Sequence, residues 1–133
     1  MGYTVEIPKR SWFAYFEFLS ERASSCPLRL EVDDRRRGIW RMERALPLVG
    51  IDVETREQGS LEVTVGNLRR EYTHRIEDPV RVQLLLDDAG NIDSIRVEER
   101  EGAVHRLVLE GASPVPAWFH EEPSAAQDAA SPL

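Results

Sequence analysis

SWFAYFEFLSERAS, from Ser11 to Ser24, is the segment whose apolar residues recur at helical spacing. At 100° per residue, one stripe of the predicted helix carries Trp12, Phe16, Leu19 and Ala23, with Tyr15 at its edge. Ser11 stands where its hydroxyl can cap the first turn. A short strand is expected over residues 3–7, and nearly every later segment up to Gly111 alternates as strands do. The sequence therefore predicts one aromatic helix that lies as a lid on a sheet.

Phe18 is an aromatic residue of this segment that lies away from the centre of the buried stripe. It shares a side of the predicted helix with Ala14, Glu21 and Arg22. In one interpretation another segment of the chain covers the ring. In the other, Phe18 is exposed and contacts a partner.

The first long strand is expected over residues 28–32, and its register follows from charge. Pairing Leu30 with Met42 places Glu31 opposite Arg41 on the wet face of the sheet. Opposite charges in directly facing positions stabilise a strand pair. We therefore predict that these two strands form a hairpin in that register.

Two prolines interrupt the strand pattern and predict where the sheet bends. Pro47 and Pro79 have no backbone N–H to donate to a ladder, so each should mark a crossing between sheet segments. Alternation through the strands that follow them places Val49 and Val80 on the inner face.

The strands between these bends bring polar residues together as well. Their register sets Val63 opposite His74, and Asp52 beside Glu62 on the outer face. Two close carboxylates can divide acid and base roles between them. Because Arg75 should lie beside both, we interpret this group as a solvated charge network.

The last three strands are expected to align Val82, Val97 and Leu107 on the inner face. This register needs three loop residues, whereas Glu101–Gly102 is typical of a two-residue turn. We keep the register that places the apolar residues on the inner face, rather than the one that the two-residue turn would give, and we expect a bulge nearby.

Composition limits the class of protein. The chain has 133 residues, of which 31% are charged, and a formal net charge of −7, which argues against nucleic acid as a partner. Cys26 is the single cysteine, so neither a disulfide framework nor a multi-cysteine zinc site is expected. The sequence has no apolar run that could span a membrane, and its first residues lack a signal-peptide core. A cytoplasmic protein with no membrane partner is the expectation.

The domain organisation follows from the change in composition after Gly111. Residues 1–111 are expected to form a single α+β domain, and 112–123 an extended segment that packs on it through Trp118 and Phe119. Residues 124–133 are small and polar without periodicity, so we expect a disordered tail.

Motifs of known catalytic sites are not found in the sequence. No Walker, GxSxG or GxGxxG pattern occurs, and His74, His105 and His120 are far apart in the chain, so no metal or cofactor is expected. Cys26 follows the helix C-terminus and lacks the setting of a reactive thiolate.

His74 is the candidate that remains, with Tyr72 beside it. Alternation places His74 on the apolar face, where burial should lower its pKa and keep it neutral. One interpretation is a structural histidine bonded to a backbone carbonyl at the Pro79 bend. The other is a polar group that lines a ligand cavity together with Tyr72.

Three stretches of the chain resemble one family. EIPKRSWFAYFEFLS, LPLVGIDVE and YTHRIEDPVRVQL occur in the order found in the bacterial DUF5335 family, a small domain of unknown function. The resemblance covers roughly residues 5–110. It implies no established activity, cofactor, partner or site residue.

The fold class expected from these observations is α+β: an N-terminal helix on a strongly bent antiparallel sheet, or partly open barrel, of about six to seven strands. For function we favour a non-catalytic module that binds a protein partner or forms a homodimer. The alternative is a small-ligand carrier with a cavity between helix and sheet. The candidate contact residues are Phe18, Tyr72, His74 and Trp118.

Overall fold

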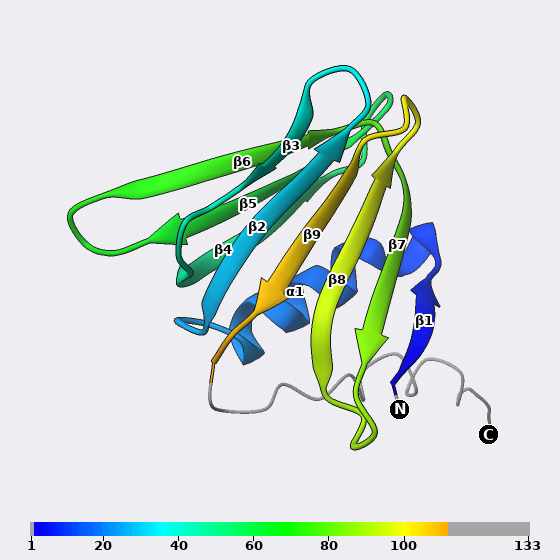
Figure 1. Cartoon of the computed structure of the whole chain (residues 1–133). Helices are drawn as coiled ribbons and strands as arrows, with labels where there is room; N and C mark the ends of the chain where they lie inside the picture. Colours follow the sequence, from blue (N-terminus) through cyan, green and yellow to red (C-terminus); the bar gives the residue numbers. More distant parts are fainter. Residues whose placement is uncertain (1, 112–133) are drawn as a thin grey trace, which may run out of the picture.

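The computed structural model describes residues 2–111 and has the predicted α+β architecture (Figure 1). The elements in chain order are β1 (Tyr3–Ile7), the 3-10 turn η1 (Lys9–Ser11), α1 (Trp12–Arg22), β2 (Pro27–Asp34), β3 (Gly38–Arg41), β4 (Leu46–Glu54), β5 (Ser60–Gly66), β6 (Glu71–Glu77), β7 (Pro79–Leu86), β8 (Ile92–Glu99) and β9 (Val104–Leu109). All strand pairs are antiparallel, in the order β1-β7-β8-β9-β2-β4-β5-β6, with β3 on β2. The described strands number nine, against about six to seven expected, and they include the short strands β1 and β3, which both pair.

The sheet divides into two halves where β2 changes partner. Pro27 and Leu28 pair with β4, but from Glu31 onward the same edge of β2 pairs with β3. β4 therefore leaves toward β5 and β6, and Pro47 lies at this divergence, as predicted. The chain returns at the predicted second bend, where Asp78, with φ 46°, and Pro79 join β6 to β7.

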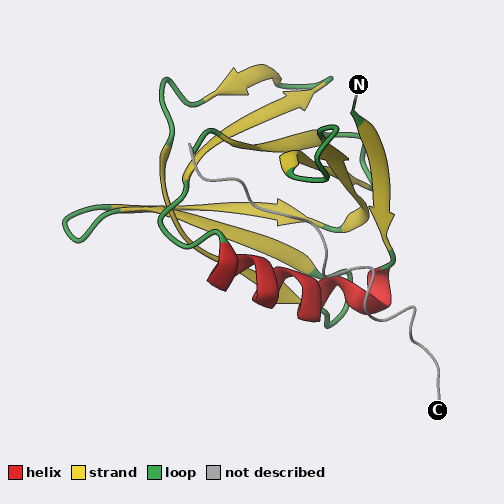
Figure 2. Cartoon of the chain, turned by 90° about the horizontal axis from the view of Figure 1, so that it is seen from below, coloured by secondary structure: helices red, strands yellow, loops and turns green. Residues whose placement is uncertain are grey.

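The helix closes one side of the folded sheet (Figure 2). The predicted stripe is confirmed, and Tyr15, expected only at its edge, is fully buried. Ser11 holds the cap position but its side chain makes no cap hydrogen bond, so that expectation is wrong. The helix is fastened elsewhere: Trp12 Nε1 donates to the carbonyl of Ile7 at 2.8 Å. Ser20 Oγ accepts from the backbone N–H of Ile51 on β4 at 2.9 Å.

Phe18 is half-buried and packs against the edge of the core. Its ring centroid lies 6.1 Å from that of Tyr15, and the Arg22 guanidinium lies 5.5 Å from it. Residues of the helix itself therefore flank the ring. Its role as a partner contact stays a prediction.

The registers of the early hairpins are confirmed. Glu31 pairs with Arg41, Asp52 with Glu62, and Val63 with His74. Each of these pairs follows from alternation on both strands of one hairpin, where a short loop limits the slip that is possible.

The register of the last hairpin is wrong by two residues. Val97 does pair with Val82, but on the other side it pairs with His105 rather than Leu107. The loop has three residues as expected, but it closes at Glu99, whose N–H donates to the carbonyl of Ala103 at 2.9 Å. Gly102, with φ 109°, supplies the backbone conformation of this tighter loop. A slip of two preserves the faces, so inward residues still point inward.

Bulges overturn two further expectations. Val49 and Val80 are exposed because the register shifts between Leu48 and Gly50 and between Pro79 and Arg81. An extra residue on one strand moves its side chain to the other face.

The predictions for residues 112–133, including Trp118 as an anchor, lie outside the described residues and stay predictions. No helix within residues 2–111 has both the length and the apolar composition that a membrane span requires.

Candidate functional site

The two sheet halves meet through a pair of histidines. Alternation on β6 turns His74 inward, and alternation on β9 turns His105 inward from the other half. His74 Nε2 and His105 Nδ1 are 2.8 Å apart, although 31 residues separate them in the chain. The fold therefore forms a hydrogen bond that neither strand predicts alone.

This contact is the centre of a longer chain of hydrogen bonds. His105 Nε2 lies 2.6 Å from the Glu99 carboxylate, and the two side chains are only 5% and 17% exposed. At the other end, Tyr72 Oη lies 3.4 Å from His74 Nδ1. The Tyr72–His74–His105–Glu99 chain of hydrogen bonds thus runs from the partly exposed phenol of Tyr72 to the buried carboxylate of Glu99.

Aromatic rings cover the outer end of this chain. The Trp40 ring is nearly parallel to that of His74, with an angle of 14° and centroids 6.0 Å apart. The Trp40 and Tyr72 centroids are 6.4 Å apart, and the two side chains are 44% and 42% exposed. Large aromatic side chains with this much exposed surface provide a flat apolar surface for a ligand.

These groups line a cavity of about 440 Å³, which we call the inner cavity. Its walls come from β2, β3, β6, β8 and β9 and the loops between them: Val32, Asp34, Arg36, Arg37, Gly38, Trp40, Tyr72, His74, Arg75, Glu77, Glu99, Glu101, Ala103 and His105. The volume is in the range of small-molecule sites, and such sites combine an apolar wall with a few convergent polar groups.

Burial sets the charge of His74. Loss of hydration lowers its pKa from 6.5 to about 4, and the neighbouring His105 contributes in the same direction. His74 is therefore neutral at neutral pH, as the alternation predicted. Its expected partner, a backbone carbonyl at the Pro79 bend, is wrong, because its ring nitrogens face Tyr72 and His105 instead.

His105, Glu99 and Trp40 are site residues that sequence reasoning missed, and His105 was the most predictable of them. The signal was present, since Leu107 faces inward and His105 lies two positions before it. The distance between His74 and His105 along the chain says nothing about which residues face one another across the two sheet halves. Within residues 2–111 no group of three His, Cys, Asp or Glu side chains is placed to hold a metal ion.

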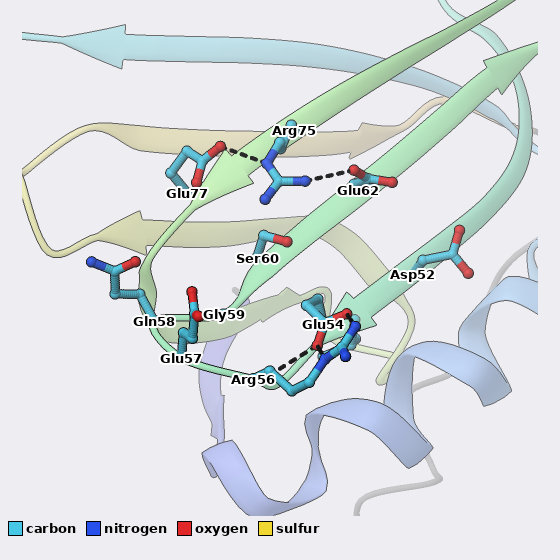
Figure 3. A pocket seen from close by; sticks show the side chains of 11 residues that line it. Asp52, Glu54, Arg56, Glu57, Gln58, Gly59, Ser60, Glu62, Arg75 and Glu77 are labelled. Atoms are coloured by element: carbon cyan, nitrogen blue, oxygen red, sulfur yellow. Dashed lines mark hydrogen bonds and ion pairs between the residues drawn. The ribbon is translucent and has the colours of Figure 1, made fainter.

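A second hollow, which we call the outer hollow, lies on the other face of β4, β5 and β6 (Figure 3). Its volume is about 470 Å³, and Arg75 bridges Glu62 and Glu77 across it. Hydrogen bonds from Arg56 lower the pKa of Glu54 to about 2. Asp52 points away from these pairs in Figure 3. Each carboxylate in an ion pair here is tied to an arginine and open to water, which favours a solvated network over acid–base chemistry.

A third hollow, of about 430 Å³, lies between the helix and β4. It includes Phe13, Glu17 and Ser20, but the Ser20 hydroxyl already bonds the Phe16 carbonyl and the Ile51 N–H. This is where a cavity between helix and sheet was expected. The Ser20 hydroxyl is therefore already satisfied within the fold.

Comparison with known proteins gives a family but no activity. The model of DUF5335, described as a family of unknown function, matches residues 3–117. An uncharacterized protein of Aquifex aeolicus (strain VF5) is 29% identical over 113 residues, which are 85% of this chain and 97% of that protein. No solved structure matches.

Proposed function

We propose, for a chain that belongs to the DUF5335 family, a binding function: the inner cavity holds a small ligand between the two sheet halves. The observation that carries the proposal is the convergence of an exposed aromatic wall on the outer end of a buried hydrogen-bond chain. Trp40 and Tyr72 supply apolar surface, and His74 supplies a polar atom that can orient a ligand.

The buried hydrogen bonds of the Tyr72–His74–His105–Glu99 chain make the site rigid. His105 and Glu99 hold the His74 ring in one orientation through two short hydrogen bonds. A ligand that meets a preorganised polar group loses less entropy on binding. The cavity is therefore suited to recognition rather than to nonspecific adsorption.

Thermal unfolding in the presence of small aromatic compounds tests this function. The panel contains phenol, indole, anisole and benzamide, because a compound that binds only the folded state raises Tm. We expect at least one compound to raise the Tm of the wild type and to lose that effect in Trp40→Ala and in His74→Ala.

Phe13→Ala is the matched control, because Phe13 is an exposed aromatic residue in the hollow beside the helix. It should keep the ligand effect. If Phe13→Ala loses the effect while Trp40→Ala keeps it, the ligand lies beside the helix and the proposal is wrong.

A second candidate function is self-association. Within the described residues, β3 pairs only with β2 and β6 only with β5, so both have an unpaired edge. Exposed Ile39 lies on β3 and exposed Leu68 at the tip of the projecting β5–β6 hairpin (Figure 1). Free edges with apolar side chains favour pairing with a second copy of the chain. Sedimentation should then show a dimer that Ile39→Glu or Leu68→Glu dissociates, whereas a monomer at every concentration excludes it.

A further inference from the structure

The buried end of the Tyr72–His74–His105–Glu99 chain determines where the protons lie. An ionised carboxylate can only accept hydrogen bonds, so His105 Nε2, at 2.6 Å from Glu99, must carry a proton and donate it. In the neutral form of His105, with its single proton on Nε2, the other ring nitrogen Nδ1 is bare. In that form His105 Nδ1 is an acceptor.

The same reasoning applies one step outward. His74 Nε2 lies 2.8 Å from the bare nitrogen of His105 and must donate to it. Because burial keeps His74 neutral, its Nδ1 has no proton. The His74 nitrogen that faces the inner cavity, Nδ1, is thus a hydrogen-bond acceptor. Glu99 determines this protonation state through the rings of His105 and His74.

Tyr72 satisfies this acceptor only weakly. Its hydroxyl lies 3.4 Å from His74 Nδ1, longer than the 2.7–3.2 Å of ordinary hydrogen bonds. The side chain is also partly exposed, so it can turn away without leaving a core position. Tyr72 presents a hydroxyl donor on a flat aromatic ring. A ligand that replaces it at His74 Nδ1 would therefore need a donor on a flat ring as well.

We propose that His105 is neutral in the folded protein and that the inner cavity therefore selects a flat aromatic ligand that carries an O–H or N–H donor, with its ring against Trp40 and its donor on His74 Nδ1. This selectivity rests on the proposed binding function and adds the class of ligand. A ring that offers only acceptor atoms would face the lone pair of His74 and lose the hydrogen bond.

Charge at the rim does not make the choice. The rim carries Arg36 and Arg37 beside Asp34 and Glu101, and Arg36 is already paired with Glu101 at 3.4 Å. Mixed charges give neither an anion nor a cation a clear advantage. The direction of the hydrogen bond is the stronger discriminator.

Phenol and anisole form a matched pair of probes, since methylation of the hydroxyl removes the donor and keeps the ring. We expect NMR titration to show that phenol binds roughly three- to tenfold more tightly than anisole, which is the effect of one net hydrogen bond. Nitrogen NMR of the free protein should show that both rings are neutral and carry their single proton on Nε2. A proton on His74 Nδ1 in the free protein contradicts the proposal directly.

Glu99→Gln tests the mechanism by which the acceptor is fixed. A glutamine amide can donate to His105 Nε2, so both directions of the chain become allowed. The preference for phenol over anisole should fall toward unity. Glu98→Gln is the control, because Glu98 is the adjacent residue on β8, has a similarly buried side chain and pairs with Arg96 instead. It should keep the wild-type preference.

Tyr72→Phe keeps the proposal testable if Glu99→Gln does not fold. Loss of the internal donor should tighten phenol binding about twofold or more and leave anisole unchanged. Equal tightening for both probes overturns the donor rule.

The two failures are distinguishable. If phenol and anisole bind equally to the wild type, or if anisole is the only compound of the panel that binds, the donor rule is wrong and the binding function stands. If no compound of the panel binds, both fall.

Discussion

The two faces of β6 carry two hollows of nearly equal volume that differ in nearly everything else. His74 lines only the inner cavity of about 440 Å³, whereas Arg75 lines both and makes its ion pairs with Glu62 and Glu77 in the outer hollow of about 470 Å³. In the outer hollow the Arg56 and Glu54 side chains are 86% and 45% exposed. In the inner cavity the His105–Glu99 pair is almost completely buried. The comparison teaches that access of water to the polar groups, not volume, distinguishes a candidate site from a surface feature.

The physical reason is the dielectric environment. Water screens the charges of the outer hollow, so each exposed ion pair contributes little and is tolerant of change. In the buried His74–His105–Glu99 part of the inner cavity, each hydrogen bond is stronger, and a lost partner leaves a buried group unsatisfied. Mutations of equal size in the two hollows should therefore have unequal effects.

The largest loss of unfolding free energy is expected for a mutation in the hydrophobic core that both regions share, and the smaller effects below are compared with it. Phe16→Ala should reduce the free energy of unfolding by about 3–5 kcal/mol, because it empties a fully buried position. Phe18→Ala should cost clearly less, since that ring is half-buried. Urea denaturation measures both, and equal losses contradict the assignment of the buried face.

The next effect is expected at the centre of the buried chain. His105→Ala removes one partner from His74 and one from Glu99, and should cost about 2–4 kcal/mol. Arg75→Ala, which breaks two ion pairs in the outer hollow, should leave the free energy of unfolding nearly unchanged. Similar losses for the two variants would remove the distinction between the hollows.

A smaller effect is expected from the titration of His74. Its pKa is about 4 in the folded state and 6.5 when unperturbed, so the unfolded chain binds more protons between these values. The contribution of His74 to stability should therefore fall as pH decreases from 6.5 to 4 and change no further below that. Each pKa unit corresponds to about 1.4 kcal/mol, but the ring is partly exposed, so we expect about 1–2 kcal/mol in total. His74→Gln should lack this part of the pH dependence, and identical pH profiles contradict it.

The smallest effect is expected at Glu54. Its pKa of about 2 lies below the ordinary value of 4.5, so its pairing with Arg56 is complete above that value and is lost as pH falls toward 2. The group is open to water, however, and salt should remove most of the interaction. Glu54→Gln should leave Tm at neutral pH and high salt unchanged. A clear loss of Tm there shows that the outer hollow is more than a solvated surface.

The hairpins show how far local pattern reaches. The β2–β3 and β5–β6 registers were predictable because apolar alternation and facing charges agree on one alignment. At β8–β9 two alignments both keep the faces inward, and the loop chemistry at Gly102 chose between them. The bulges at Val49 and Val80 were not predictable, because the alternation of apolar and polar residues along a strand gives no sign of where an extra residue is inserted.

The sequence by itself determined the helix and its buried stripe, the strands, the two bends and the inward position of His74. Periodicity and proline chemistry act within a few residues, so they can be read from neighbours in the chain. Only the tertiary structure decided that His74 meets His105, that Glu99 lies behind it, and that Trp40 covers the opening. The physical reason is that these contacts join strands from different halves of the sheet. Which side chains face each other there depends on how the halves fold over one another, and no local pattern contains that information.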